Sequence, residues 1–356
     1  MNQNKIKTID NISSNDKKNI ASLIFVRACC CLGIVIYHYF EHARGNYKSY
    51  FRTANSNIGL LFVTSFFNIS GTVLYYNYPK VTSIKKFYYK RWKSILIPYY
   101  ICNFLFYISV SLIKHKLIYK GPWKLLLFNL IGLDGYLQYS YNYKAVNFGG
   151  IGEWFLGAII IIYFLYPLIV LMMNINIFII NYIILINYYI MYKTNIYANV
   201  LYEHNIFTCL KSFYFGMIVI KFKNFFFKKK LVLILCFLLL LFLFLFEISK
   251  TFFLISQIHG FALYIFLLRI GEYIMRTKFA TVYHEINGLS YSIFLYHHYI
   301  IRNILQIYNP IDLNSHLILL FETIFIILIY SKIHSIIVGL VLKSKIFKIM
   351  DSFFLS

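Results

Sequence analysis

Long apolar stretches alternate with short polar, mostly basic segments along almost the whole chain. Apolar runs of roughly 20 residues, the length that an α-helix needs to cross the hydrocarbon core of a bilayer, recur between positions 20 and 342. The pattern predicts ten spans, at about 20–40, 57–78, 94–113, 152–173, 175–192, 206–220, 231–247, 251–270, 288–308 and 316–342. We therefore expect an all-α fold, a polytopic membrane bundle of about ten transmembrane helices.

The basic residues divide unevenly between the two ends of these spans. With the N-terminus in the cytoplasm, 21 of the 35 Lys and Arg residues fall in inside segments and 10 in outside segments. Since Lys and Arg are retained on the cytoplasmic side, both termini are expected there. The chain then has a cytoplasmic tail (1–19), a transmembrane domain (20–342) and a cytoplasmic C-terminal tail (343–356). One long outside segment, 114–151, mixes apolar and aromatic residues and is expected to lie over the mouth of a cavity.

Composition excludes several classes of protein. Of the 356 residues, 60% are hydrophobic and only 13% are charged, which excludes a cytosolic enzyme. The formal net charge of +23 comes from basic residues that lie mostly in the segments between spans, where they set the topology. Nucleic acid is therefore not an expected partner, whereas membrane lipids are. The six cysteines have neither a disulfide framework nor metal-ligand spacing, and we predict no metal site.

The first predicted span carries two ionisable residues, Arg27 and His38. Eleven residues make about three helical turns, so both side chains point the same way, about 16 Å apart along the axis. Ionisable groups inside spans usually face a polar interior. The imidazole suits a general base, and the arginine suits an anionic ligand such as a phosphate. Glu41, one turn after His38, could orient the imidazole. The alternatives are a packing histidine and an arginine that snorkels to the interface.

Four other segments place polar or aromatic residues where spans begin or pack. They are the Phe-rich stretch Phe66 to Gly71, the basic cluster from Arg91 that ends in Ile-Pro-Tyr at Tyr99, Trp154 to Leu156, and Phe294 to His297. Taken in order with Arg27 and His38, which have ten residues between them, these segments resemble the acyltransferase-3 family of integral-membrane acyltransferases. Two departures are that the usual arginine pair of the third helix is reduced to Arg91, with Lys93 nearby, and that Phe294 stands where tyrosine is common.

The resemblance implies that residues 20–342 form an acyltransferase domain in the bacterial cytoplasmic (inner) membrane. It implies transfer of an acyl group, typically acetyl from acetyl-CoA as co-substrate, to a hydroxyl of a cell-surface glycan or lipid-linked sugar, with no bound cofactor. The expected catalytic residues are His38 and Glu41, although the role of Glu41 comes from its position and not from the family. The expected donor-binding residues are Arg27, Arg91 and Lys93, and the expected cavity-lining residues are Ser70, Trp154 and His297.

Two functions of other classes also fit a polytopic chain with polar residues inside its spans. One is a flippase or carrier for lipid-linked sugars, and the other is a glycan polymerase with a large outside loop. Neither requires a cation and a base on one face of one helix, so Arg27 and His38 favour the acyltransferase.

Overall fold

The computed structural model describes residues 14–43, 58–114, 126–141, 151, 153–194, 202–246, 254–308 and 310–355, and every element in these ranges is helical. In chain order the elements are α2 (Ser14–His42), α3 (Ile58–Asn77), α4 (Ile84–Lys114), α5 (Leu126–Leu130), α6 (Asp134–Tyr141), α7 (Glu153–Ile175), α8 (Phe178–Lys193), the short 3₁₀ helix η3 (Tyr202–His204), α9 (Ile206–Lys221), α10 (Lys223–Lys228), α11 (Lys230–Leu245), α12 (Leu254–Ile274), α13 (Ala280–Ile307), α14 (Leu313–Leu342) and α15 (Lys345–Leu355).

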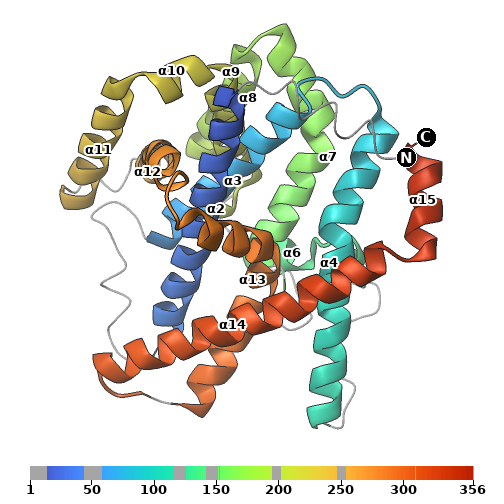
Figure 1. Ribbon diagram of the computed structural model, residues 1–356. Coiled ribbons are helices and arrows are strands. Elements are labelled where there is room, and N and C mark those ends of the chain that lie inside the picture. The colour runs from blue at the N-terminus through green and yellow to red at the C-terminus, as the bar shows by residue number, and fades with distance from the viewer. Residues whose placement is uncertain are drawn as a thin grey trace.

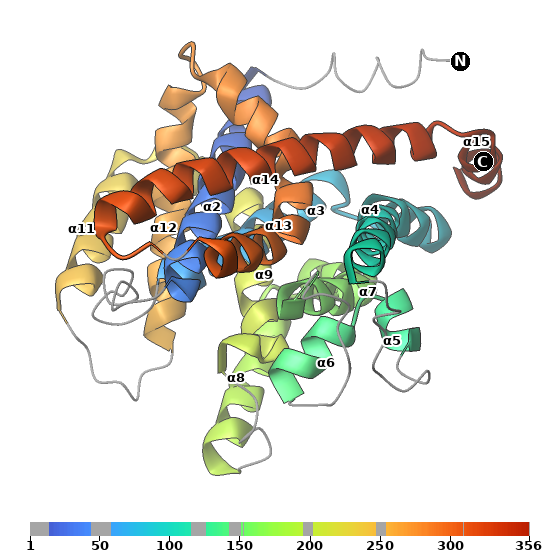
Figure 2. The same ribbon diagram turned by 90° about the horizontal axis from the view of Figure 1, so that it is seen from below.

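Helix α2 lies at the centre of the bundle and packs against α3, α12 and α13 (Figures 1 and 2). Its small residues allow this close packing: Ala28 and Cys30 are fully buried, as is Val26. A helix that is apolar on most of its surface is typically surrounded by other helices. The polar side chains of α2 therefore face protein and a cavity instead of lipid.

Each predicted span coincides with a helix, but the helices differ in how well they suit a membrane. Four are long and apolar enough to cross one, namely Ala21–His42, Ile58–Asn77, Glu153–Ile175 and Leu313–Leu342, and two shorter apolar helices are Phe178–Met191 and Lys230–Leu245. The others are shortened or carry ionisable residues, as α13 does with three histidines, a glutamate and an arginine. The chain is thus a helical membrane protein, while ten spans and cytoplasmic termini stay predictions.

Glycines let α3 and α9 approach each other closely. A Cβ atom added at Gly71 would collide with the backbone carbonyl oxygen of Phe213, and one added at Gly216 with that of Asn68. The Thr72 hydroxyl donates a hydrogen bond to the Gly216 carbonyl oxygen across the same contact, at 2.8 Å. This is the small-residue packing by which membrane helices associate.

Replacing Gly71 by alanine is expected to destabilise the protein by about 1–3 kcal/mol, because backbone atoms on the facing helix cannot move aside as a flexible side chain can. The measurement is the thermal midpoint of the purified protein in detergent. Gly339→Ala is the matched control, since a Cβ atom there would meet nothing within 4 Å. Equal midpoints for the two variants would contradict the role of Gly71 in packing.

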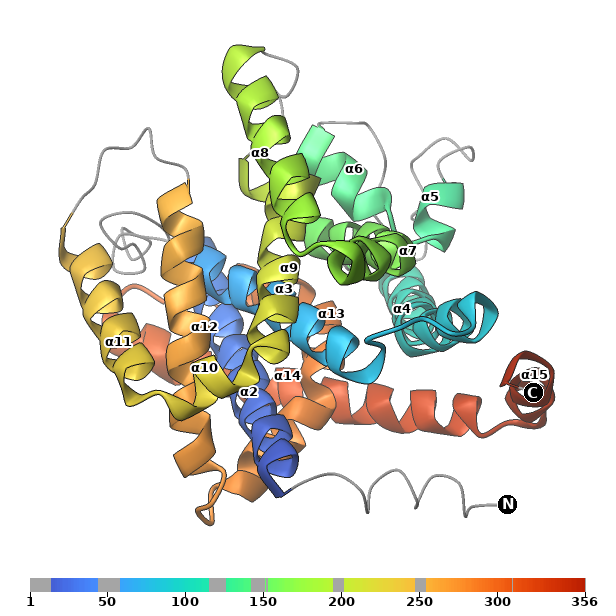
Figure 3. The ribbon, with the colours of Figure 1, turned by 90° about the horizontal axis from the view of Figure 1, so that it is seen from above.

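The described part of the long outside segment packs on α7. Figure 3 shows α5 and α6 beside α7, on the side of the molecule away from α11. Asp134, at the start of α6, accepts hydrogen bonds from the Tyr99 hydroxyl at 3.1 Å and the Asn129 amide at 3.0 Å. Burial raises the pKa of Asp134, and these two hydrogen bonds oppose the shift. The contact ties α6 to α4, so this part of the segment is a packed element of the fold.

The C-terminal segment lies beside the basic start of α4. The Lys93 ammonium contacts both carboxylate oxygens of Asp351, at 2.6 and 2.7 Å, and the Tyr89 hydroxyl donates to the same carboxylate at 2.8 Å. Figure 1 shows α14 running slantwise across the bundle to α15, which reaches α4. The two segments that the charge pattern assigned to one side of the membrane therefore lie together.

Candidate active site

Helices α2, α3, α7 and α13 and the short η3 surround a cavity of about 790 Å³. Six of the eight site residues predicted from the sequence line it, namely Arg27, His38, Glu41, Ser70, Trp154 and His297. These residues come from four different helices, and α3 and α7 contact each other through Phe67 and Phe155, whose ring centroids are 4.7 Å apart. One space therefore collects most of the polar groups that the sequence singled out.

Arg27 and His38 both face this cavity from α2, as their spacing predicted. In the described part of the chain, no carboxylate forms an ion pair with Arg27, which is half-buried. A guanidinium without a counter-ion is costly inside a membrane, and an anionic ligand would offset that cost. Arg27 therefore suits the binding of an anion deep in the cavity.

A carboxylate holds the imidazole of His38. Nδ1 of His38 lies 2.9 Å from a carboxylate oxygen of Glu41, one turn away, and the Tyr37 hydroxyl donates to the other oxygen at 3.3 Å. Because the carboxylate can only accept, Nδ1 carries the proton and Nε2 keeps its lone pair. The His38 side chain is 16% exposed. An oriented and accessible imidazole of this kind is suited to act as a general base.

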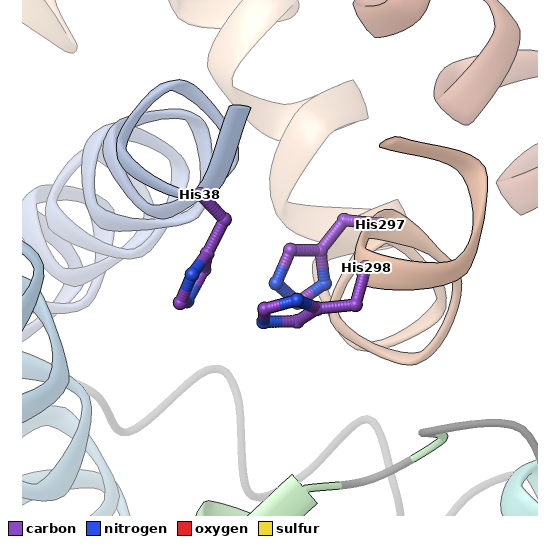
Figure 4. Close-up of side chains that lie close together, drawn as sticks. All are labelled: His38, His297 and His298. Atoms are coloured by element: carbon purple, nitrogen blue, oxygen red, sulfur yellow. The ribbon is translucent and has the colours of Figure 1, made fainter. Parts of the chain in front are cut away.

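His297 faces His38 from α13 with its tautomer equally well defined. Its Nδ1 donates to the carbonyl oxygen of Phe294 at 2.7 Å, so Nε2 carries the lone pair. Within the described ranges, this buried Nε2 has no hydrogen-bond partner. The ring centroids of His38 and His297 are 5.4 Å apart (Figure 4).

Glu153 is a site residue to which the sequence analysis gave no role. It begins α7 with a φ of +27°, a conformation that L-residues rarely adopt and that often marks a functional site. One of its carboxylate oxygens lies 2.7 Å from Nε2 of His298. The only signal in the sequence was an acidic residue at the border of an apolar span, and nothing local linked it to His298.

Two further contacts complete the outer wall of the cavity. The ring of Trp154 stacks on His204 of η3, with centroids 4.1 Å apart. The Tyr136 hydroxyl of α6 donates to the His204 carbonyl oxygen at 2.9 Å, so the outside segment supports this wall. Glu203 and His204, which the sequence analysis did not single out, line the cavity through these contacts.

Two predicted donor-binding residues lie outside the cavity lining. Lys93 is paired with Asp351, as described above. Arg91 lies over the rings of Tyr78 and Tyr163, 5.7 and 6.0 Å from their centroids, and Tyr163 itself lines the cavity. Arg91 is therefore one layer behind the wall, and donor contacts by Arg91 and Lys93 stay predictions.

The fold and this cavity define a helical membrane enzyme with a histidine–carboxylate pair inside the bundle. The model of the acyltransferase-3 family, described as an acyltransferase domain, matches residues 20–337, nearly the whole chain. The protein belongs to this family and is a membrane acyltransferase, which confirms the resemblance found in the sequence. No curated protein and no solved structure matches the chain significantly.

Proposed function

We propose that this acyltransferase moves an acyl group, acetyl in the first instance, from acyl-CoA to a hydroxyl group of a cell-surface glycan or a lipid-linked sugar. The observation that carries the proposal is the shared cavity, in which the His38–Glu41 pair and Arg27 face the same space. The proposed setting is the bacterial cytoplasmic membrane, with both chain termini and the basic loops on the cytoplasmic side. Acyl-CoA would enter from that side.

The proposed reaction uses the lone pair on Nε2 of His38. The acceptor hydroxyl gives its proton to this nitrogen while its oxygen forms a bond to the thioester carbonyl carbon. The bond between that carbon and the CoA sulfur then breaks, and the sulfur takes the proton from His38. Glu41 keeps Nδ1 protonated and stabilises the imidazolium that forms in between.

Arg27 is proposed to hold the anionic part of the donor. Its planar guanidinium matches phosphate oxygens, and it lies about 16 Å from His38 along α2, on the same helix face. CoA is rich in phosphate, so its acyl end can extend from Arg27 toward the imidazole. The outer wall around Trp154 and His204 is left for the acceptor.

The test is acyl transfer by the purified protein in liposomes. Labelled acetyl-CoA should release free thiol and pass its label to glycan acceptors extracted from the cell surface, and both signals should require protein and acceptor. Mass spectrometry of surface glycans from cells with and without the gene would show which sugar carries the acetyl group. If no thiol is released while labelled lipid-linked sugar crosses the bilayer, the protein is a carrier and the proposal is wrong.

Glu41→Gln is expected to lower kcat of this transfer by about 10²-fold, because an amide no longer holds the Nδ1–H tautomer of His38 or stabilises the imidazolium. The KM for acyl-CoA should change little, since Glu41 lies at the His38 end of the cavity. Glu285→Gln is the matched control, because Glu285 forms only an exposed ion pair with Lys332 on the surface. Full activity of Glu41→Gln would remove Glu41 from the mechanism.

A further inference from the structure

Three histidines from two helices converge in the cavity. One ring nitrogen from each of His38, His297 and His298 can be chosen so that all three atoms lie within 4.8 Å of one another. The His298 ring centroid is 3.9 Å from that of His38 and 4.4 Å from that of His297, and Figure 4 shows the rings of α13 facing the ring of α2. A general base needs one imidazole, whereas three converge here.

The hydrogen bonds of His298 define its tautomer through its neighbours. Nε of Arg302 donates to Nε2 of His42 at 3.4 Å, so this nitrogen of His42 is an acceptor. The contact of 3.3 Å between Nε2 of His42 and Nδ1 of His298 then requires Nδ1 of His298 to donate. A carboxylate oxygen only accepts, so the 2.7 Å contact between Glu153 and Nε2 of His298 needs a cation at that nitrogen, which is either a proton or a metal ion.

Three imidazoles and a carboxylate thus meet in one place, and Nε2 carries the lone pair in His38 and His297. In the part of the chain that the structure describes, the buried Nε2 atoms of His297 and His298 find no hydrogen-bond donor. Buried acceptors this close repel one another unless a cation lies among them.

We propose that a divalent transition-metal ion of the Zn²⁺ class binds here, held by His38, His297 and His298, with the Glu153 carboxylate beside Nε2 of His298. Imidazole and carboxylate are ligands that Zn²⁺ prefers in a four-coordinate site. A histidine that binds a metal through one ring nitrogen usually has a hydrogen-bond partner on the other. Nδ1 of each ring has such an outer partner here: the Glu41 carboxylate for His38, the Phe294 carbonyl oxygen for His297 and the His42 imidazole for His298. The two carboxylates, Glu41 and Glu153, balance the charge of the ion.

The site could not be predicted from spacing along the chain. Its ligands lie on α2 and α13, and only two of them are close in sequence. The sequence analysis predicted no metal site because the six cysteines lack metal-ligand spacing. The tertiary structure alone brings a residue at position 38 to residues near positions 153 and 297.

Metal binding and acyl transfer are mutually exclusive in this geometry, a consequence that rests on the proposed function. The lone pair on Nε2 of His38 cannot bind the ion and accept a proton at the same time. Zn²⁺ is therefore an inhibitor that a chelator removes. The binding itself does not depend on the reaction.

The experiment measures metal binding directly on the full-length protein in lipid nanodiscs, without a polyhistidine tag and after removal of metals with a chelator. Titration with Zn²⁺ against a coloured competing chelator should give one ion per chain, and Mg²⁺ should not compete, since it prefers oxygen ligands. Co²⁺ in the same site should give the strong visible absorption of a tetrahedral complex. Weak binding with no defined stoichiometry, or an octahedral spectrum, would overturn the proposal.

Variants then identify the ligands. His298→Gln and His297→Gln should each weaken Zn²⁺ binding at least about tenfold, and Glu41→Gln, which touches only the outer partner of His38, by about 10–100-fold. His284→Gln is the matched control, because His284 lies on the same helix as two of the ligands but is exposed. Size-exclusion elution and helical circular dichroism show whether each variant folds. Equal affinity in the control and the ligand variants would show that the ion binds elsewhere.

The two proposals fail separately. Stoichiometric Zn²⁺ binding without any acyl transfer would leave the metal site in place and remove the proposed function. If the protein binds no Zn²⁺ and transfers acyl groups without inhibition by Zn²⁺, the proposed metal site is wrong and the proposed function stands.

Discussion

Replacing His38 by alanine is expected to lower kcat of acyl transfer by about 10³-fold, because no other described residue that lines the cavity combines a fixed lone pair with access to the acceptor. His38 is held by Glu41 and is partly exposed, whereas Nε2 of His297 is buried. The measurement is the initial rate of thiol release from acetyl-CoA in liposomes at saturating donor. The KM for the donor should stay within about twofold, because His38 lies far from Arg27.

His284→Ala is the matched control for this substitution, since it removes an exposed imidazole from α13. Equal size-exclusion profiles for both variants would show that a loss of rate is not a loss of fold. A His38→Ala protein that keeps the wild-type rate would end its assignment as general base, and His297 would then be the next base to test.

Replacing Arg27 by alanine is expected to raise the KM for acyl-CoA by about 10–100-fold, which corresponds to losing a charge-assisted contact of about 1.5–3 kcal/mol. The guanidinium faces the cavity, and no described carboxylate neutralises it. The KM for the glycan acceptor should not change, since the acceptor is proposed to lie at the other end of the cavity. Rates measured over a range of donor concentrations separate the two constants.

Arg27→Lys should fall between the wild type and the alanine variant, because lysine keeps the charge but not the planar arrangement of donors. Arg276→Ala is the control for removing an arginine, since Arg276 is exposed and stacks only on Tyr273. An unchanged donor KM in Arg27→Ala, or an equal rise in both KM values, would exclude a specific role in holding the donor.

Much of the fold could be predicted from the sequence because its signals are local. A run of apolar residues predicts a helix wherever it occurs, and all ten predicted spans are helical. The same holds for Arg27 and His38, whose shared face follows from helical periodicity alone. The ends of the helices were less well predicted, since α4 and α13 begin several residues before their apolar stretches.

The site was predicted less completely because most of its contacts join distant parts of the chain. Glu153 gained its meaning only from His298, which lies on another helix. Lys93 shows the opposite case: the family resemblance implied that it binds the donor, and in the fold it pairs with Asp351, near the C-terminus. No local pattern contains either pairing.

The sequence by itself determined that the chain is a helical membrane protein of the acyltransferase-3 family, with a cation and a base on one face of its first long helix. Hydrophobicity and helical periodicity act over a few turns and can be read along the chain. Only the tertiary structure decided that this face meets α13, so that His38 lies beside two more histidines. Helix packing depends on the shapes of surfaces that are far apart in sequence, and it therefore set which polar groups share the cavity.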